Sequence, residues 1–467
     1  MRFFVLLLLI AGTGLAVRYL LPKLYPDGNY QGDPITVTWT EFVLGLVVMS
    51  ILFLVIINPV GTNMARGNSL KYKEFWNGYE TAANHSTIPC GRDGQCAFHY
   101  NCDPYEVTIH HPATYDSKGN ITSPAYDTTE THYHHCPYAT EEWVDTVDTT
   151  LGSYQISHGF SDHPQEWRGG SGIPGAVQQG HTFFWVEAGN RIRAGVPGGM
   201  TVRKTYDNYI LASQYSILKK WSGAIEQYQA KRLMPKPVTS IDGFYYANKV
   251  YFVGGMFPHF TYGDWRFAIN KLNGALGSDL QGDLHLVIAD TADVKNPDEF
   301  SQALFAYWQS PKLGRDAASK NTIIVVVGTD GKTVKWSRAD TGMPLGNEQL
   351  LTDLRNNLVG TALTPDALIG NPRIKGDHKV ERGEGALENI LWGPHKFDRV
   401  CMTCKDEKGK TGFQYLKGQI PLSGGQKWAI GFVTFFISLL IWGVMCVVDL
   451  HIPDVLEFEV PRLRRNR

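Results

Sequence analysis

Three long apolar runs near the two ends of the chain constrain its fold more than any other feature. They cover residues 3–21, 42–57 and 428–448. A helix needs about 20 mostly apolar residues to cross the hydrocarbon core of a bilayer, so the third run is long enough alone and the first two need their flanking residues. We therefore predict three transmembrane helices, with a folded region between the second and the third.

The first run also has the features of a secretory signal peptide, because its apolar stretch has a suitable length and Arg2 precedes it. No good small-residue cleavage site follows that stretch. We therefore expect residues 3–21 to be retained as an uncleaved, signal-anchor-like helix and to remain part of the protein.

Charge alone supports two opposite topologies. The basic tail, residues 449–467, favours a cytoplasmic C-terminus under the positive-inside rule. Arg66, Lys71 and Lys73 follow the second run more densely than Lys23 precedes it, which locally favours the reverse. The cysteines decide between the two topologies.

Six of the seven cysteines lie between the second and third apolar runs, an even number that can pair as disulfides in an oxidising compartment. They are Cys90, Cys96, Cys102, Cys136, Cys401 and Cys404. Triplets of the N-glycosylation type also occur at Asn84 and Asn120. We therefore expect the bulk of the chain to be extracytoplasmic, in a periplasm, a lumen or the cell exterior, with a cytoplasmic tail.

The membrane-proximal part, residues 58–236, is predicted to be a loop-rich α+β region stapled by disulfides. Its cysteines follow a Cys-x5-Cys-x5-Cys spacing with a distant fourth. Six histidines lie among them, so a zinc site is the alternative, but neither Cys-x2-Cys nor His-x3-His spacing occurs there. Cys401 and Cys404 do have a metal-knuckle or redox spacing, for which a disulfide is again favoured. Farther along, the apolar stretch from His181 to Val186 predicts a short strand.

The distal part, residues 238–420, shows the alternation of strands and helices that is typical of an α/β domain. Residues 284–289 and 322–327 are apolar runs of strand length. Between them, Asn296 and Glu299 form a capping-box pattern at the start of a helix. The two strands should therefore be parallel, and residues 333–338 should return antiparallel as a hairpin.

Several short segments of this part resemble the TPM domain family. They are Gly282-Asp283-Leu284-His285-Leu286-Val287-Ile288, a helix carrying Trp308, Leu313-Gly314-Arg315, the stretch from Ser319 to Val327, and Asp340-Thr341-Gly342. The resemblance covers about residues 245–370 and implies a mixed sheet flanked by helices, typically in a membrane-anchored, extracytoplasmic protein. The N-terminal half resembles no family that we can name.

The resemblance also implies a set of candidate metal ligands. TPM domains carry acidic residues at the C-terminal edge of the sheet, and the matching positions here are Asp290, Asp293 and Asp340. Carboxylates clustered there can hold Ca²⁺ or Mg²⁺, which can polarise a phosphoryl group. The alternative, which we favour, is that these aspartates cap turns and helices.

Three functions follow from these observations. A net charge of −1 excludes a broad basic surface for nucleic acid, and no P-loop, nucleophile elbow or zinc-protease helix is present. We therefore expect an accessory or structural subunit that binds partner proteins of a membrane complex. The alternatives are a metal-dependent acid phosphatase of the TPM type and a cell-surface or viral envelope recognition protein.

Overall fold

The computed structural model comprises two compact units. The first holds Met1–Tyr72, Tyr206–Tyr215 and Cys401–Arg467, and the second holds Lys73–Thr205 and Ser216–Val400. The structure describes residues 3–24, 26, 37–160, 181–238, 243–244, 247–257, 262–310, 313, 318–343, 345–374, 380–403 and 412–447. The two predicted halves of the polar middle, which we expected to divide near residue 237, both belong largely to the second unit.

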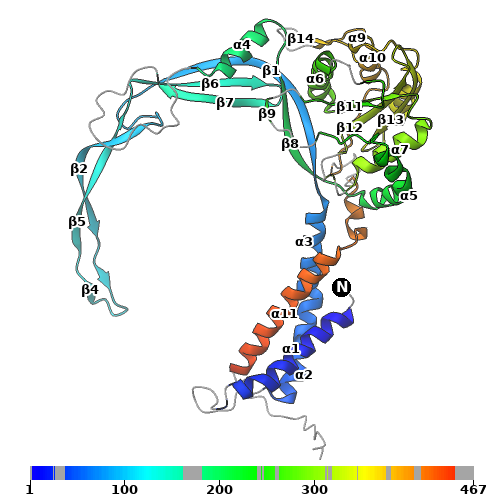
Figure 1. Ribbon diagram of the computed structural model, residues 1–467. Coiled ribbons are helices and arrows are strands. Elements are labelled where there is room, and N and C mark those ends of the chain that lie inside the picture. The colour runs from blue at the N-terminus through cyan, green and yellow to red at the C-terminus, as the bar shows by residue number, and fades with distance from the viewer. Residues whose placement is uncertain are drawn as a thin grey trace, which may run out of the picture. The chain divides into compact units, whose positions relative to one another are not determined.

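Three helices of the first unit are long and apolar enough to cross a membrane. They are α1 (Phe3–Leu24), the continuous helix Trp39–Leu70 and α11 (Gly424–Val447) (Figure 1). The second helix is longer than predicted and consists of α2 (Trp39–Leu52), a π-helical turn η1 (Phe53–Ile57) and α3 (Asn58–Leu70). Pro59 does not end this helix. It lies in the first turn of α3, directly after the π-helical turn, and a proline is tolerated in the first turn of a helix. A short helix, η3 (Gln414–Gln419), precedes α11.

Trp442 of α11 is the centre of the packing among these helices. Its side chain is fully buried, and its ring stacks on Phe42 of α2 with 5.3 Å between centroids. The indole N–H donates a hydrogen bond of 3.1 Å to the carbonyl of Ile10 in α1. A Cβ atom at Gly14 or Gly45 would overlap this ring, so the glycines let the three helices approach closely.

A five-stranded sheet begins directly after the second apolar helix. Its strand order is β7-β6-β1-β8-β9. The strands are β1 (Lys71–Pro89), β6 (Glu141–Thr149), β7 (Gly152–Phe160), β8 (Gly199–Asp207) and β9 (Gly243–Phe244). Its paired strands β1–β6, β6–β7 and β8–β9 are antiparallel.

The segment that follows His181 is a helix and not the predicted short strand. Helix α4 covers Phe183–Arg193. Thr182 is its N-cap, because the Thr182 hydroxyl accepts a hydrogen bond of 3.3 Å from the backbone N–H of Trp185. This cap starts a helix in a stretch whose apolar composition also suits a strand.

A long two-stranded ribbon lies between β1 and β6 in the sequence (Figure 1). Strands β2 (His99–His111) and β5 (Tyr126–Pro137) pair antiparallel along nearly their full length. The short strands β3 (Thr114–Tyr115) and β4 (Ile121–Ser123) close its tip. The side chains of the ribbon are largely exposed on both faces and none is buried, in contrast to the long strands β1 and β6.

The remainder of the second unit has the predicted mixed α/β architecture. Its four-stranded sheet has the order β10-β11-β12-β13, in which the first three strands are parallel and β13 returns antiparallel. The strands are β10 (Val250–Val253), β11 (Asp283–Asp290), β12 (Thr322–Thr329) and β13 (Val334–Thr341). A separate two-stranded pair contains β14 (Arg373–Ile374) and β15 (Val380–Glu381).

Helices cover both faces of this sheet and enclose two apolar cores. One face carries α6 (Tyr262–Leu280), α8 (Glu348–Asn356), α9 (Pro365–Leu368) and α10 (Ala386–Leu391). The other face carries α7 (Pro297–Trp308) and the second part of α5 (Leu211–Ala230). As predicted, Asn296 caps α7, and its side chain accepts a hydrogen bond of 3.2 Å from the N–H of Glu299.

Candidate functional site

The three aspartates implied by the family resemblance lie at two ends of the sheet. Asp290 ends β11 and is opposite Thr329 in β12, whereas Asp340 of β13 is opposite Ile324. These two positions of β12 are separated by about 16 Å at the usual rise of a strand. Because β13 runs antiparallel to β12, Asp340 lies away from the edge that holds Asp290 and Asp293.

Hydrogen bonds within the fold occupy all three carboxylates. Asp290 accepts from the N–H of Ala292 and Asp293 from the N–H of Gly255, both at 2.7 Å, so each stabilises a turn. Asp340 accepts from Ser301 and Gln302 of α7, and burial raises the pKa of Asp340. No group with metal-ligand spacing among the described residues includes any of these aspartates. A Ca²⁺ or Mg²⁺ site at this edge stays a prediction.

The first four cysteines of residues 58–236 pair as two disulfides. Cys90 is bonded to Cys96, and Cys102 is bonded to Cys136. Cys401 is also disulfide-bonded, and Cys404 lies outside the described residues. The same two pairs, with Glu142 and with Asp103 respectively, are also among the groups of described residues that have metal-ligand spacing.

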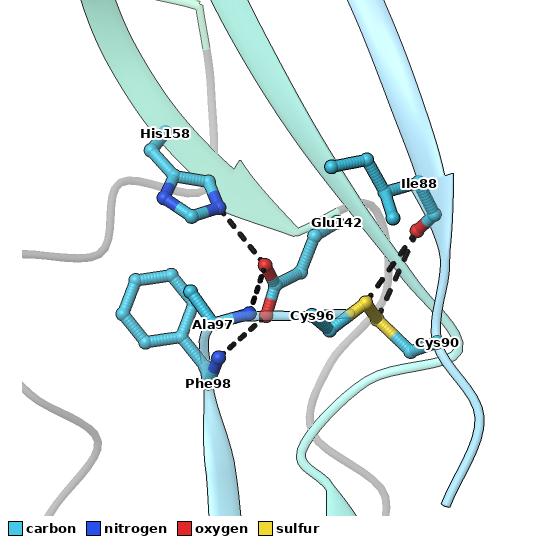
Figure 2. Close-up of a disulfide and its surroundings, with 7 residues drawn as sticks. All are labelled: Ile88, Cys90, Cys96, Ala97, Phe98, Glu142 and His158. Atoms are coloured by element: carbon cyan, nitrogen blue, oxygen red, sulfur yellow. Dashed lines mark hydrogen bonds and ion pairs between the residues drawn. A yellow bond between two sulfur atoms is a disulfide. The ribbon is translucent and has the colours of Figure 1, made fainter. Parts of the chain in front are cut away.

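A buried carboxylate organises the chain around the first disulfide (Figure 2). Glu142 of β6 accepts hydrogen bonds from the N–H groups of Ala97 and Phe98 at 2.9 and 2.8 Å. The same carboxylate contacts Nε2 of His158 at 2.9 Å. Glu142 therefore holds the start of β2 against the five-stranded sheet, with the disulfide beside it.

Replacing Cys102 and Cys136 together with serine should destabilise the ribbon by about 3–4 kcal/mol, because the disulfide closes a loop with a sequence separation of 34. Hydrogen exchange measured by mass spectrometry should become faster in β2 and β5 and stay unchanged in β11. Replacing Cys90 and Cys96, whose separation is 6, is the matched control and should cost only about 2 kcal/mol. Equal acceleration in both double variants would contradict this assignment.

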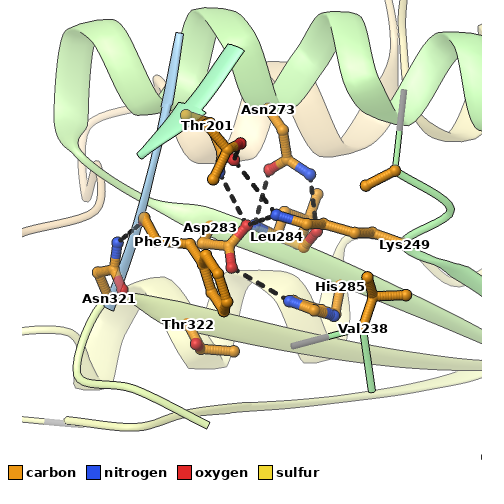
Figure 3. Close-up of polar contacts among 12 residues, drawn as sticks. Phe75, Thr201, Val238, Lys249, Asn273, Asp283, Leu284, His285, Asn321 and Thr322 are labelled. Atoms are coloured by element: carbon orange, nitrogen blue, oxygen red, sulfur yellow. Dashed lines mark hydrogen bonds and ion pairs between the residues drawn. The ribbon is translucent and has the colours of Figure 1, made fainter. Parts of the chain in front are cut away.

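A buried polar network joins the five-stranded sheet to the α/β sheet (Figure 3). Lys249 forms an ion pair with Asp283 at the start of β11. Asn77 of β1 donates to Asp283 at 2.8 Å and accepts from Thr201 of β8 at 2.6 Å. His285 contacts the second oxygen of Asp283 at 3.2 Å. These contacts explain why both halves of the polar middle form one unit.

Burial and charge act in opposite directions on this network. Burial alone would raise the pKa of Asp283, but the charge of Lys249 and the hydrogen bonds from Lys249 and His285 outweigh burial and hold that pKa below its usual range. Burial lowers the pKa of His285, which keeps its imidazole neutral near pH 7. The carboxylate therefore carries its charge opposite the lysine.

A second polar cluster lies on the five-stranded sheet and was not predicted from the sequence. His85 of β1, Asp145 of β6 and Ser157 of β7 are directly opposite one another on adjacent strands, so their side chains share one face. The two oxygens of Asp145 lie 2.9 Å from Nδ1 of His85 and 2.8 Å from Nδ1 of His181. The Ser157 hydroxyl donates to Asp145 at 2.9 Å.

Exposure differs sharply within this cluster. The Asp145 side chain is 0% exposed, whereas those of His85 and His181 are 36% and 44% exposed. Burial alone would raise the pKa of Asp145, but the hydrogen bonds from the two histidines and Ser157 lower it overall. The cluster therefore presents a buried anion beneath two accessible imidazoles.

Two tryptophans surround the imidazoles. Trp185 of α4 stacks on His181 with 4.7 Å between centroids, and Trp143 of β6 lies 5.2 Å from the same ring. The indole N–H of Trp185 contacts the carbonyls of Asn84 and Thr146 at 3.2 Å, which fixes α4 on the sheet. The sequence signal that the strand prediction missed is Thr182, a residue type typical of an N-cap, which indicates that a helix begins directly after it.

The two candidate glycosylation sites have different environments. Asn120 is exposed in the turn between β3 and β4, where its side chain donates to Asp116 at 3.1 Å. Asn84 lies within β1, and its side chain donates to Asp148 of the neighbouring strand at 2.5 Å. Asn120 is therefore the better placed acceptor for a glycan.

No protein-family model, curated protein or solved structure matches this chain. The resemblance of residues 245–370 to TPM domains accordingly stays a prediction. The mixed α/β fold, the three apolar helices and the disulfides are seen in the structure of this chain and do not depend on a comparison with any other protein.

Proposed function

We propose that this chain is a membrane-anchored accessory subunit that binds partner proteins of a membrane complex outside the cytoplasm. In this proposal the α/β domain is TPM-like, and the ribbon formed by β2 and β5 is the partner-binding element. The exposure of the ribbon on both faces is the observation that carries the proposal.

An isolated two-stranded hairpin is only marginally stable in water, because it lacks an apolar layer to bury. This ribbon nevertheless displays large side chains to solvent. Tyr105, Tyr126 and Tyr133 are 42–54% exposed, and Tyr115 and Ile121 at the tip are 63% and 61% exposed. Tyrosine is enriched among the residues that dominate binding at protein interfaces. A partner protein would supply the layer that the ribbon lacks.

The other features of the chain agree with this role. The three apolar helices suit membrane anchoring, and disulfides persist mainly in oxidising compartments outside the cytoplasm. The hydrogen bonds from turn N–H groups to Asp290 and Asp293 favour a structural role for these aspartates over the phosphatase alternative. In this proposal the polar middle of the chain lies outside the cytoplasm, so a single membrane crossing by α11 leaves the C-terminal tail in the cytoplasm.

Removing the distal ribbon should abolish partner binding without unfolding the chain. Pro104 is opposite Tyr133, so residues 104–133 can be replaced by an Asn-Gly turn that keeps the Cys102–Cys136 bond. We expect the full chain, released from its own membrane in mild detergent, to migrate in a large assembly. The shortened chain should migrate alone. Native mass measurement gives the size of the particle formed by each chain, and quantitative peptide mass spectrometry gives its composition.

Point variants test whether partner binding depends on the exposed side chains at the tip of the ribbon and not only on the length of the ribbon. Replacing Tyr115 and Ile121 with serine should weaken co-purification, whereas serine at Leu345 and Val359, which are about as exposed on the α/β domain, should leave it intact. A full chain that migrates alone, or a shortened chain that keeps its partners, would refute the proposal. Metal-dependent phosphomonoester hydrolysis that Asp290→Ala abolishes would instead favour the phosphatase.

A further inference from the structure

We propose that His85, Asp145 and His181 form a binding site for a divalent transition-metal ion of the zinc type. The proposal is independent of partner binding by the ribbon. It rests on the positions of the three side chains, on their chemistry and on the groups that support them.

The spacing of the candidate ligand atoms suits a single ion. One nitrogen from each histidine and one oxygen from Asp145 all lie within 4.8 Å of one another. Around tetrahedral zinc, ligand atoms at the usual bond lengths of about 2.0–2.1 Å are roughly 3.3 Å apart. At present Nδ1 of His85 and Nδ1 of His181 lie 2.9 and 2.8 Å from the two different oxygens of Asp145. A bound ion would replace these two hydrogen bonds and take its place between the carboxylate and the imidazoles.

The chemistry of the ligand set selects the class of metal. Two imidazole nitrogens and one carboxylate are typical of zinc and related transition metals, whereas Ca²⁺ and Mg²⁺ prefer oxygen ligands. Three protein ligands leave at least one coordination position open for water or an external ligand. The partial exposure of His85 and His181 provides a route of entry from solvent.

Neighbouring residues hold the ligands as a metal site requires. Ser157 donates to Asp145 and orients the carboxylate, which is the usual role of a hydrogen bond to a metal-binding carboxylate. Trp143 and Trp185 flank the imidazoles with apolar surface. Two of the ligands are paired across β1 and β6, and the third directly precedes the N-cap of α4. The ligands therefore come from regular elements and a capped helix start.

Cobalt and zinc binding by the full chain in detergent tests the proposal. The protein should carry a purification tag without histidines, since a polyhistidine tag would bind both metals. We expect one Co²⁺ per chain with visible absorption of a low-coordinate site, and displacement of Co²⁺ by Zn²⁺. His85→Gln and His181→Gln should each weaken Zn²⁺ binding at least 100-fold, and Ser157→Ala should weaken it about 10–100-fold. Competition with a chelator measures these affinities.

The controls distinguish this site from other histidines of the chain. His110 contacts Asp127 through Nδ1 at 2.6 Å on the exposed ribbon, so His110→Gln removes a similar pair and should leave binding unchanged. Because Asp145 is buried, the two partly exposed histidines are the primary variants, and far-UV circular dichroism checks their folding. Absence of stoichiometric binding by the folded chain, or unchanged binding in the His85→Gln/His181→Gln variant, would overturn the proposal. Co-purification of partners would be unaffected by either result.

Discussion

Replacing Asp283 with alanine should lower the free energy of unfolding of the second unit by about 3–5 kcal/mol. Lys249 is only 4% exposed at its side chain, so the variant leaves a buried ammonium group without its counter-charge. Asn77 loses the acceptor of its hydrogen bond as well. The slowest amides of β11 and β12 exchange only when the core unfolds. Their hydrogen exchange therefore measures the decrease in the free energy of unfolding.

Two further variants test whether the buried charge is the cause. Asp298→Asn removes an ion pair with Arg338 in which the aspartate side chain is 75% exposed, and it should cost less than about 1 kcal/mol. Changing Lys249 to methionine and Asp283 to leucine together should be less damaging than Asp283→Ala alone, because neither charge is then left unpaired. A double variant that is less stable than Asp283→Ala would contradict the explanation.

The same ion pair sets an acid limit for the second unit. The folded pKa of Asp283 lies below its ordinary value, so its stabilising contribution is complete above about pH 5. The contribution should disappear only as the pH falls through the lowered folded pKa. The difference in stability between the wild type and Asp283→Ala should therefore be constant from about pH 5 to pH 7 and shrink at lower pH.

Trp442→Ala should destabilise the packing of the three apolar helices by about 3–5 kcal/mol, the usual cost of removing a buried aromatic side chain. The substitution removes the stack on Phe42 and the hydrogen bond to Ile10. Helix association can be read by cross-linking, because the hydroxyl oxygens of Thr13 and Ser438 are 2.6 Å apart. Cysteines at those two positions, in a Cys446→Ser background, should form a disulfide efficiently only when Trp442 is present.

Trp428 provides the matched control in the same helix. Its side chain is 70% exposed, so Trp428→Ala should leave the cross-link between the two introduced cysteines unchanged. If Trp442→Ala gave the same cross-linking yield as Trp428→Ala, Trp442 would not organise the helices.

Several elements could be predicted because their signals are local. The capping pattern at Asn296 and Glu299 marks the start of α7, and the apolar runs of β11 and β12 suit strands buried on both faces. The stretch after His181 shows where such signals conflict. Its apolar residues suit a strand, but the Thr182 cap and packing of Trp185 on the sheet make it helical.

The three apolar helices, the disulfide-rich region and the order of elements in the α/β domain could all be predicted from the amino-acid sequence. These features follow from composition and from periodicity over a few residues. Which polar residues contact one another, by contrast, depends on how the strands pair. The direction of β13 separates Asp340 from Asp290, and the pairing of β1, β6 and β7 aligns His85, Asp145 and Ser157. Strand direction and register are set by contacts between distant segments, and a short stretch of sequence does not contain them.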